Sequence, residues 1–409
     1  MSGPVPVPFP ARAVRAPYRV SLVLGTRPEG VKLIELVRLL RADARFAPSV
    51  IVTGQHRQMV DEILRPFGVE PDFDLGIMTS RQTLNGILER LLPRLEERFA
   101  EDRPHLVVVQ GDTTSAFGAA LAAFNRGIAV AHVEAGLRSF DRFHPYPEEA
   151  NRRMLSCVSD LHFAPTAYAA ENLMHEGVPR EEIYVTGNTV VDSLLLALEK
   201  GRAAPDEAPR GRPIVLLTLH RREGWDPVGG GRAPIEGLFE KIAEAAERHP
   251  ELDFVYPVHH NPRVREPAQR LLGPLPNVQI VDPLPYIPFV KLMARASAIL
   301  TDSGGIQEEA PSLGTPVLVL RRTTERPEGL TSSRRLLGDS PDDVVAGLDK
   351  LLSQPATWVG QPPYPNPFGD GRASARIRDG ILHFMGAGER PDEFAEPRPL
   401  QSRRGPGPR

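Results

Sequence analysis

The feature that most constrains this chain is a regular alternation of short apolar runs with helix-like segments. Two apolar runs, Val107–Val109 and Ile128–Val133, flank an Ala-rich segment with helical spacing. This arrangement is typical of two parallel strands joined by a crossover helix. Because runs of both kinds recur along most of the chain, we expect an α/β fold built on parallel sheets.

The alternation occurs in two blocks. The first begins with a strand expected at Val20–Leu24 and closes with one expected at Val185–Asn188. A polar, Pro-containing stretch, Gly201–Pro213, follows as the best candidate for a linker. The alternation restarts at Ile214–Leu219, and 409 residues exceed what one ordinary core supports. The pattern therefore predicts two Rossmann-like domains that face each other across a cleft, a favoured place for a ligand.

The expected division of the chain follows from these blocks and from the composition of its ends. It consists of a disordered N-terminal arm over 1–17, an N-terminal Rossmann-like domain over 18–200, a C-terminal Rossmann-like domain over 213–372, a helix over 373–390 that packs back on the N-terminal domain, and a disordered tail over 391–409. The arm is predicted to be disordered because it is rich in proline and short of continuous apolar sequence.

Composition disfavours several classes of function. The net charge of −3 gives no basic field for nucleic acid or for a membrane surface. Cys157 is the only cysteine, so an internal disulfide is excluded and a zinc or iron–sulfur site is disfavoured. No apolar run is long enough to span a bilayer, and the N-terminus does not have the pattern of a signal peptide. We expect a cytoplasmic protein.

Three acidic residues stand where strands of the first block are expected to end. Asp112 follows the first apolar run, Glu134 follows the second, and Glu148 comes one loop later. Ligands bind at the carboxyl ends of strands in open parallel sheets, so the three carboxylates indicate acid–base chemistry. On the residues alone a structural role is an equal alternative. In that alternative the acids form helix caps and salt bridges: Asp112 can cap the following helix, and Glu148 can open the next one.

Two strand-to-helix turns have features of anion-binding loops. In the first, Gly25–Gly30, the helix N-terminus is expected to offer free amides, and Arg27 can pair with phosphate oxygens. In the second, Ser303, Gly304 and Gly305 can present successive backbone N–H groups to a diphosphate. One such turn in each block predicts a nucleotide-phosphate site between the two domains.

Other nucleotide motifs are missing from the sequence. Neither turn is a P-loop, and neither fits the GxGxxG pattern with a later acidic residue, so a nicotinamide cofactor is not supported. Glu309, in the first turn of the helix after the second loop, is placed to accept the two hydroxyls of a ribose. His259 and His260 are adjacent and have no acidic partner at metal-motif spacing, so we expect them to contact a ligand by hydrogen bonds.

A series of short motifs, taken in order, resembles the non-hydrolysing UDP-N-acetylglucosamine 2-epimerases. The motifs are GTRPEGVK, TGQHRQM, QGDTTS, HVEAGLR, PEEANRR, TGNTVVD, HRRE, TDSGGIQEEAPSLGTPVL and TERPEG. The resemblance spans roughly residues 18–385, and many motifs in the same order are far more specific than any one of them. It implies a fold similar to that of GT-B glycosyltransferases, a homodimer, interconversion of UDP-GlcNAc and UDP-ManNAc, and neither NAD nor a catalytic metal.

The resemblance also implies site residues. Its catalytic set is Asp112, Glu134, Glu148 and His220, the last of which also matches a UDP contact. Its substrate-binding set is Arg27, Lys32, Arg152, Ser303, Gly304, Gly305, Glu309 and Arg326. Some members of this family are activated by UDP-GlcNAc in a second pocket, which here matches Gln55, Gln58, Arg81, Gln82, Arg221 and His259.

The chemistry of the implied reaction is consistent with several carboxylates. The C2 proton of the sugar is not next to a carbonyl, so direct removal faces a high barrier, and elimination is the route that needs no redox cofactor. One carboxylate takes the C2 proton as UDP leaves C1, and UDP re-adds while a proton reaches the opposite face. We expect Asp112 and Glu148 to transfer the protons and Glu134 to orient the sugar or to share the proton. Three alternatives stay open: a hydrolysing relative that releases UDP and ManNAc, a GT-B glycosyltransferase, and a nucleotide-sugar binding module without catalysis.

Overall fold

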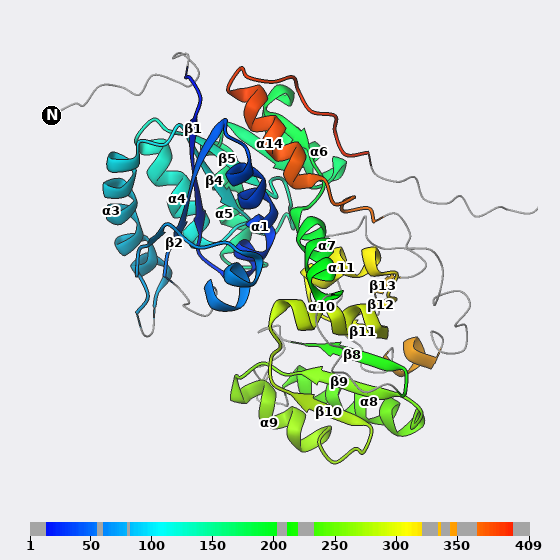
Figure 1. Cartoon of the computed structure of the whole chain (residues 1–409). Helices are drawn as coiled ribbons and strands as arrows, with labels where there is room; N and C mark the ends of the chain where they lie inside the picture. The colour runs from blue at the N-terminus through cyan, green and yellow to red at the C-terminus, as the bar shows by residue number, and fades with distance from the viewer. Residues whose placement is uncertain are drawn as a thin grey trace, which may run out of the picture.

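The computed structural model describes residues 14–54, 60–79, 82–202, 211–219, 233–320, 334–336, 344–349 and 366–395. Within them the chain forms two parallel sheets, each covered by helices on both faces (Figure 1). The α/β fold that the alternating sequence predicts is therefore confirmed. None of the described helices has an apolar stretch long enough to cross a membrane.

The first sheet has seven strands in the order β3-β2-β1-β4-β5-β6-β7. These are β1 (Tyr18–Leu24), β2 (Phe46–Val52), β3 (Phe73–Asp74), β4 (Leu106–Gln110), β5 (Ala129–Val133), β6 (Leu161–Ala164) and β7 (Ile183–Val185). The order changes direction between β1 and β4, and such a switch point is where open α/β sheets bind ligands. The turn that begins at Gly25 and the turn that carries Asp112 both leave the sheet at this point.

The helices of the first half pack on opposite faces because side chains alternate along each strand. Leu22 and Leu24 of β1 join a core with α1, α7 and α14, whereas Val23 joins a second core with α3, α4 and α5. The bounds are α1 (Arg27–Ala42), α3 (Leu84–Asp102), α4 (Thr114–Asn125), α5 (Glu148–Val158), α6 (Ala167–His175) and α7 (Thr189–Arg202), with short turns η1 (Val60–Leu64), η2 (Arg65–Phe67) and η3 (Arg180–Glu182).

The second sheet repeats the architecture with six strands in the order β10-β9-β8-β11-β12-β13. Its strands are β8 (Ile214–Thr218), β9 (Asp253–Pro257), β10 (Val278–Val281), β11 (Ala296–Thr301), β12 (Val317–Val319) and β13 (Arg334–Leu336). Its helices include α8 (Pro234–Arg248), α9 (Pro262–Leu271), α10 (Tyr286–Arg295) and α11 (Gly304–Leu313). Here the order changes between β8 and β11, and the Ser303–Gly305 turn follows β11.

Helix α7 connects the two halves and packs against both of them. It contacts α1 and α14 on one side and α10 and α11 on the other, so one apolar core runs from the first sheet to the second. Helix α14 (Ala373–Phe384), near the end of the chain, lies against the half that holds β1 to β7 (Figure 1). The Asp192 carboxylate on α7 accepts the N–H groups of Ala373 (3.2 Å) and Ser374 (2.7 Å), which fixes the start of α14.

Two expectations about chain ends and strand ends are wrong. The last strand of the first half ends at Val185, because Gly187 takes a left-handed φ of 83° and the Asn188 side chain accepts the Val190 N–H to start α7. The predicted disordered tail begins at residue 391, yet Phe394 is buried and its N–H donates to the Val185 carbonyl at 2.8 Å. Residues 1–13, 203–210 and 396–409, which hold the rest of the predicted arm, linker and tail, lie outside the described residues.

Candidate active site

Asp112 and Glu134 leave the ends of two neighbouring strands. Strands β4 and β5 pair in parallel with Gln110 opposite Val133, so the residues that follow them emerge side by side. Both turns depend on left-handed backbone: Gly111 has φ 73° and Glu134 has φ 68°. A residue with a Cβ atom seldom adopts this conformation, which carries a cost in backbone strain. The surrounding contacts therefore hold Glu134 in place.

Three donors surround the Glu134 carboxylate. Gln110 Nε2 (3.0 Å) and Asn188 Nδ2 (3.2 Å) donate to its Oε2, and the Lys32 ammonium forms an ion pair with the same oxygen. The Glu134 side chain is only 7% exposed, so the charge pair is shielded from water. Lys32 is expected near the site by resemblance alone, and here it meets a predicted catalytic carboxylate.

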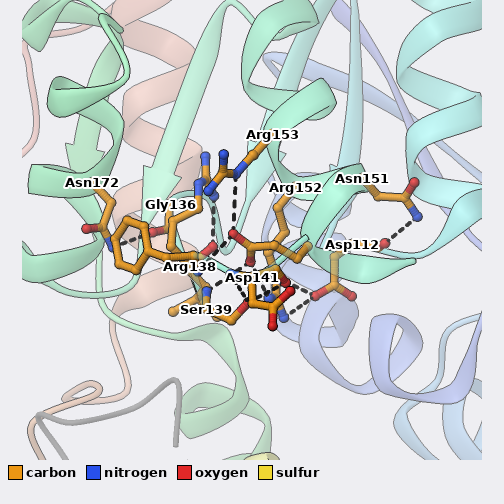
Figure 2. Close-up of polar contacts among 12 residues, drawn as sticks. Asp112, Gly136, Arg138, Ser139, Asp141, Asn151, Arg152, Arg153 and Asn172 are labelled. Carbon is orange, nitrogen blue, oxygen red and sulfur yellow. Dashed lines mark hydrogen bonds and ion pairs between the residues drawn. The ribbon is translucent and has the colours of Figure 1, made fainter. Parts of the chain in front are cut away.

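Asp112 has a different environment, set by helix α5. Arg152 directs Nε (2.8 Å) and Nη2 (2.7 Å) at Asp112 Oδ2, and the Asn151 side chain donates to the Asp112 carbonyl at 2.9 Å (Figure 2). The Asp112 side chain remains 22% exposed, three times the fraction of Glu134. It is thus anchored at one oxygen and still accessible to a ligand.

The helix-capping alternative for Asp112 is contradicted, whereas its salt bridge with Arg152 matches the other structural alternative. The structural alternative for Glu148 is confirmed in part. The N-cap of α4 is Thr113, whose hydroxyl oxygen accepts the Ala116 N–H at 3.0 Å, so Asp112 does not cap that helix. Glu148 is the first residue of α5, where a carboxylate interacts favourably with the helix dipole. It lies four residues before Arg152 and hence on the face of α5 that meets Asp112.

Glu149, next to Glu148, has a structural role. It is fully buried, accepts the N–H groups of Ser139 (2.9 Å) and Phe140 (3.2 Å), and pairs with Arg152 Nη1 at 3.1 Å. Glu149 therefore holds the loop that follows Glu134 against α5. The two adjacent glutamates thus divide their roles: one fixes the loop, and its half-buried neighbour stands at the helix N-terminus.

The same loop is fixed a second time by a buried arginine. Arg138 donates to both carboxylate oxygens of Glu176, at 2.8 and 2.6 Å, and to the Ser156 hydroxyl at 2.8 Å. The Asn172 side chain donates to the Gly136 carbonyl at 3.0 Å (Figure 2). Helices α5 and α6 therefore clamp the segment between Glu134 and Glu148, and we expect the spacing of these two acids to be rigid.

The first predicted anion-binding turn is filled by the protein itself. The N–H groups of Gly25 and Thr26 donate to the carboxylate of Glu29, so they are not the free amides that the sequence predicts. Thr113, next to Asp112, donates its hydroxyl to the other Glu29 oxygen at 2.6 Å. Burial, with a contribution from nearby Asp112, raises the pKa of Glu29 to about 7. Arg27 at this turn pairs with Glu62 at 3.3 Å and remains 39% exposed.

The second predicted turn keeps two of its three predicted amides available, because the Ser303 N–H is bonded within the turn. Strand β11 ends at Thr301, whose hydroxyl oxygen accepts the Ser303 N–H at 2.9 Å, and α11 begins at Gly304. Within the described part of the chain, the N–H groups of Gly304 and Gly305 meet no acceptor. Free N–H groups at a helix N-terminus form an anion-binding position. Of the two turns, this one is therefore suited to a diphosphate.

Glu309 is a buried carboxyl near the junction of the two halves. It lies in the second turn of α11, and not in the first turn as predicted, because the helix already begins at Gly304. It accepts the Tyr286 hydroxyl at 2.8 Å, and burial raises the pKa of Glu309 to about 7 despite that hydrogen bond and the charge of Lys32. The Tyr286 ring in turn lies 6.3 Å from the Phe67 ring of the first half. The position expected to bind ribose is thus built where the two halves meet.

The remaining predicted residues are only partly described. His259 follows β9, is exposed, and accepts the Asn261 N–H at Nδ1 (3.0 Å). Gln82, just before α3, donates weakly to the Ile77 carbonyl at 3.4 Å. The others lie outside the described residues: His220, Arg326, Gln55, Gln58, Arg81 and Arg221.

Five residues that contact the candidate site residues or their loops are missed by reasoning from the sequence. They are the charge and hydrogen-bond partners Glu29, Gln110, Glu149, Asn188 and Glu308. Each lies inside one of the short motifs quoted above, and that position is the available signal. Sequence reasoning misses them because acids and amides next to a strand end are often surface residues, and because their partners come from distant parts of the chain.

Comparison with known proteins identifies a family. The family model for UDP-N-acetylglucosamine 2-epimerase matches residues 38–382. The UDP-N-acetylglucosamine 2-epimerase of Bacillus subtilis is 44% identical over 380 residues, which cover 92% of this chain and 98% of that protein. The crystal structure of UDP-GlcNAc 2-epimerase from Neisseria meningitidis bound to UDP-GlcNAc has a TM-score of 0.82 at 40% identity and covers 89% of this chain and all of the other.

One more distant likeness concerns the fold alone. The glycosyltransferase of kitacinnamycin matches 90% of this chain and 96% of its own at 15% identity, with a TM-score of 0.51. Two parallel sheets shared with a glycosyltransferase confirm the GT-B-like architecture that the sequence predicts.

Proposed function

The chain belongs to the UDP-N-acetylglucosamine 2-epimerase family, and we propose that it is a non-hydrolysing epimerase that interconverts UDP-GlcNAc and UDP-ManNAc. One observation carries this proposal. Lys32 joins Glu134, at the end of β5, to Glu308 on α11, the helix whose first amides are free. A diphosphate bound at the start of α11 would thus have its sugar directed toward the carboxylates of the first half.

We propose that UDP is bound mainly by residues of the second half. The amides of Gly304 and Gly305 would receive the diphosphate, because they are donors at a helix N-terminus that meet no acceptor in the described part of the chain. Glu309 would accept the two ribose hydroxyls as a carboxylate. Arg27 would reach the departing phosphate from the other side, since its guanidinium is partly exposed at the first turn. Donors of this kind stabilise the negative charge that develops on UDP as it leaves.

Proton transfer is proposed for Asp112 and Glu148. In elimination, the C2–H electrons form the C1–C2 double bond as the bond from C1 to the phosphate oxygen breaks, and the proton moves to one carboxylate. The products are UDP and 2-acetamidoglucal, and re-addition of UDP is accompanied by protonation of C2 on the opposite face. Asp112 is accessible, and Glu148 lies on the same face of α5 as the Asp112 partner Arg152. Glu134 has three donors on one oxygen, which suits it to orient the sugar.

Two further properties are proposed on the same family membership. We expect a homodimer, and we expect activation by UDP-GlcNAc at a second position that includes Gln82 and His259. A rate curve for UDP-ManNAc that is strictly hyperbolic without added UDP-GlcNAc would count against activation. No cofactor is proposed.

The deciding experiment is turnover of UDP-GlcNAc in D₂O. We expect UDP-ManNAc to accumulate with one deuterium at C2, and UDP to remain attached to sugar at equilibrium. Release of free UDP with free ManNAc would identify a hydrolysing enzyme instead. Turnover that requires a separate acceptor would identify a glycosyltransferase. Binding of UDP-GlcNAc with no product and no exchange would identify a binding module.

A further inference from the structure

A buried histidine lies close in sequence to Glu134 and contacts the residue before Asp112, and the proposed mechanism does not use it. His132 is the last residue but one of β5, two residues before Glu134, and its side chain is fully buried. Its Nε2 atom is 2.7 Å from the carbonyl oxygen of Gly111, the residue that precedes Asp112. The next residue, Val133, accepts the Gly111 N–H at 3.0 Å. Both polar groups of the Gly111 backbone are therefore held by the two residues that precede Glu134.

The hydrogen bond to Gly111 determines where the imidazole proton lies. A carbonyl oxygen only accepts, so His132 Nε2 must carry the hydrogen. Among the described residues Nδ1 has no hydrogen-bond partner, and a second proton there would be a buried donor without an acceptor. Burial accordingly lowers the pKa of His132 to about 4. The ring is neutral at physiological pH and acts as a fixed donor rather than as an acid or a base.

The hydrogen bond from His132 matters because it fixes the backbone at Gly111, the residue before Asp112. Gly111 has a left-handed φ of 73° and connects Gln110, which lies opposite Val133 of β5, to Asp112. A rotation of the Gly111 peptide would move Asp112 relative to the sugar. We propose that His132 is a positioning residue that sets the spacing of Asp112 and Glu134 by holding the Gly111 carbonyl. This inference rests on the proposed function, because the spacing matters only if Asp112 transfers a proton.

A second buried histidine provides a matched control. His162 on β6 pairs in register with His132, is also fully buried, and lies on the same face of the sheet. No contact of His162 with Gly111 is present among the described residues. Loss of its imidazole therefore removes similar packing without releasing the Gly111 carbonyl.

The test compares side chains of different reach at these two positions. Gln places its amide nitrogen as far along the side chain as Nε2 of histidine, whereas Asn is one carbon shorter. We expect His132→Asn to lower kcat by about 10- to 100-fold, since displacement of a catalytic group by about 1 Å has effects of this size. KM for UDP-GlcNAc and the Kd for UDP should change little, because the second half holds the nucleotide. His132→Gln should recover kcat to within a few-fold of wild type.

The control variant and the unfolding temperature separate positioning from stability. His162→Asn should lower the unfolding temperature about as much as His132→Asn while keeping kcat within a few-fold of wild type. Should His132→Asn fail to fold, His132→Leu is measured instead, with the same expectation. Equal kcat losses in His132→Gln and His132→Asn, or an equal loss in His162→Asn, would overturn the inference. A wild-type protein without epimerase activity would instead overturn the proposed function.

Discussion

The Nζ atom of Lys32 in α1 lies 3.6 Å from the Oε2 atom of Glu308 in α11 of the second half. The same ammonium forms an ion pair with Glu134 at the end of β5. One buried cation is therefore shared by an acid from each half. Lys32 also lies near enough to Glu309 to favour its charged form. The position of the proposed nucleotide helix is in this way linked to the position of a proposed catalytic acid.

Loss of the Lys32 charge should affect stability and catalysis together. Lys32→Met would leave Glu134 and Glu308 buried without their cation, and breaking a buried ion pair costs about 3–5 kcal/mol. Urea unfolding and kcat are the measurements. The matched control is Lys241→Met, because Lys241 pairs with Glu244 at the surface of α8, where a pair contributes about 0–1 kcal/mol. Equal effects of the two substitutions would contradict the bridging role.

Asp112→Asn should abolish proton transfer and leave the fold intact. The Asn side chain keeps the shape and can still accept from Arg152, but it cannot take the C2 proton. We expect kcat to fall by about 10²- to 10⁴-fold, the range for one general acid–base group. Incorporation of deuterium at C2 in D₂O should fall in parallel. Asp141→Asn, at an exposed loop position, serves as the control. Deuterium exchange at the wild-type rate in Asp112→Asn would remove Asp112 from the mechanism.

Adjacent glutamates at the start of α5 should respond in opposite ways. Glu149→Gln replaces a buried carboxylate that binds two backbone N–H groups and Arg152, so we expect a loss of about 2–4 kcal/mol in unfolding free energy. Glu148→Gln should lower kcat strongly with little change in the unfolding midpoint. Each variant is the control for the other, with circular dichroism and kcat measured on both. A stable, inactive Glu149→Gln beside an active Glu148→Gln would reverse the two assignments.

Binding of UDP should release protons near neutral pH. The pKa of Glu309 is raised to about 7 by burial, so a fraction of the group is protonated before nucleotide binds. Two ribose hydroxyls that donate to it would favour the carboxylate and lower its pKa. Calorimetry of UDP binding at pH 7 in buffers of different ionisation enthalpy measures the release. Glu309→Gln should eliminate most of the proton release. Unchanged release in that variant would show that the released proton comes from a group other than Glu309.

Asp192 should make the protein less stable as pH rises. Burial raises the pKa of Asp192 from 3.8 to about 6, although it accepts two amides of α14. A carboxyl whose pKa is higher in the folded state binds its proton more tightly there. Its stabilising effect is complete below the unfolded pKa and is lost as pH rises through the folded value. Between about pH 4 and pH 7, the range that spans the unfolded and folded pKa values of Asp192, the unfolding free energy should therefore lose this contribution, and should fall less in Asp192→Asn. An identical pH slope in both proteins would show that Asp192 does not titrate in this range.

Local sequence is sufficient for the elements and for part of the site. Strand and helix differ in the period of their apolar residues, so the alternation predicts parallel sheets, and consecutive strands such as β4 and β5 are neighbours in most α/β folds. That rule by itself predicts that Asp112 and Glu134 lie close together. The position of the turn at Ser303, between a strand and a helix, is also predicted correctly, because a strand end followed by Ser-Gly-Gly is a local signal.

Partners from distant parts of the chain are decided by the tertiary structure. Glu29 occupies the amides of its own turn, and it does so beside Thr113, which is 84 residues away in the sequence. Lys32 meets Glu308 only because α7 packs the two halves together. The spacing of apolar residues along the sequence does not determine which buried carboxylate pairs with which donor. Hydrophobic spacing determines the elements one by one, whereas the pairing of charges depends on how those elements are packed against one another.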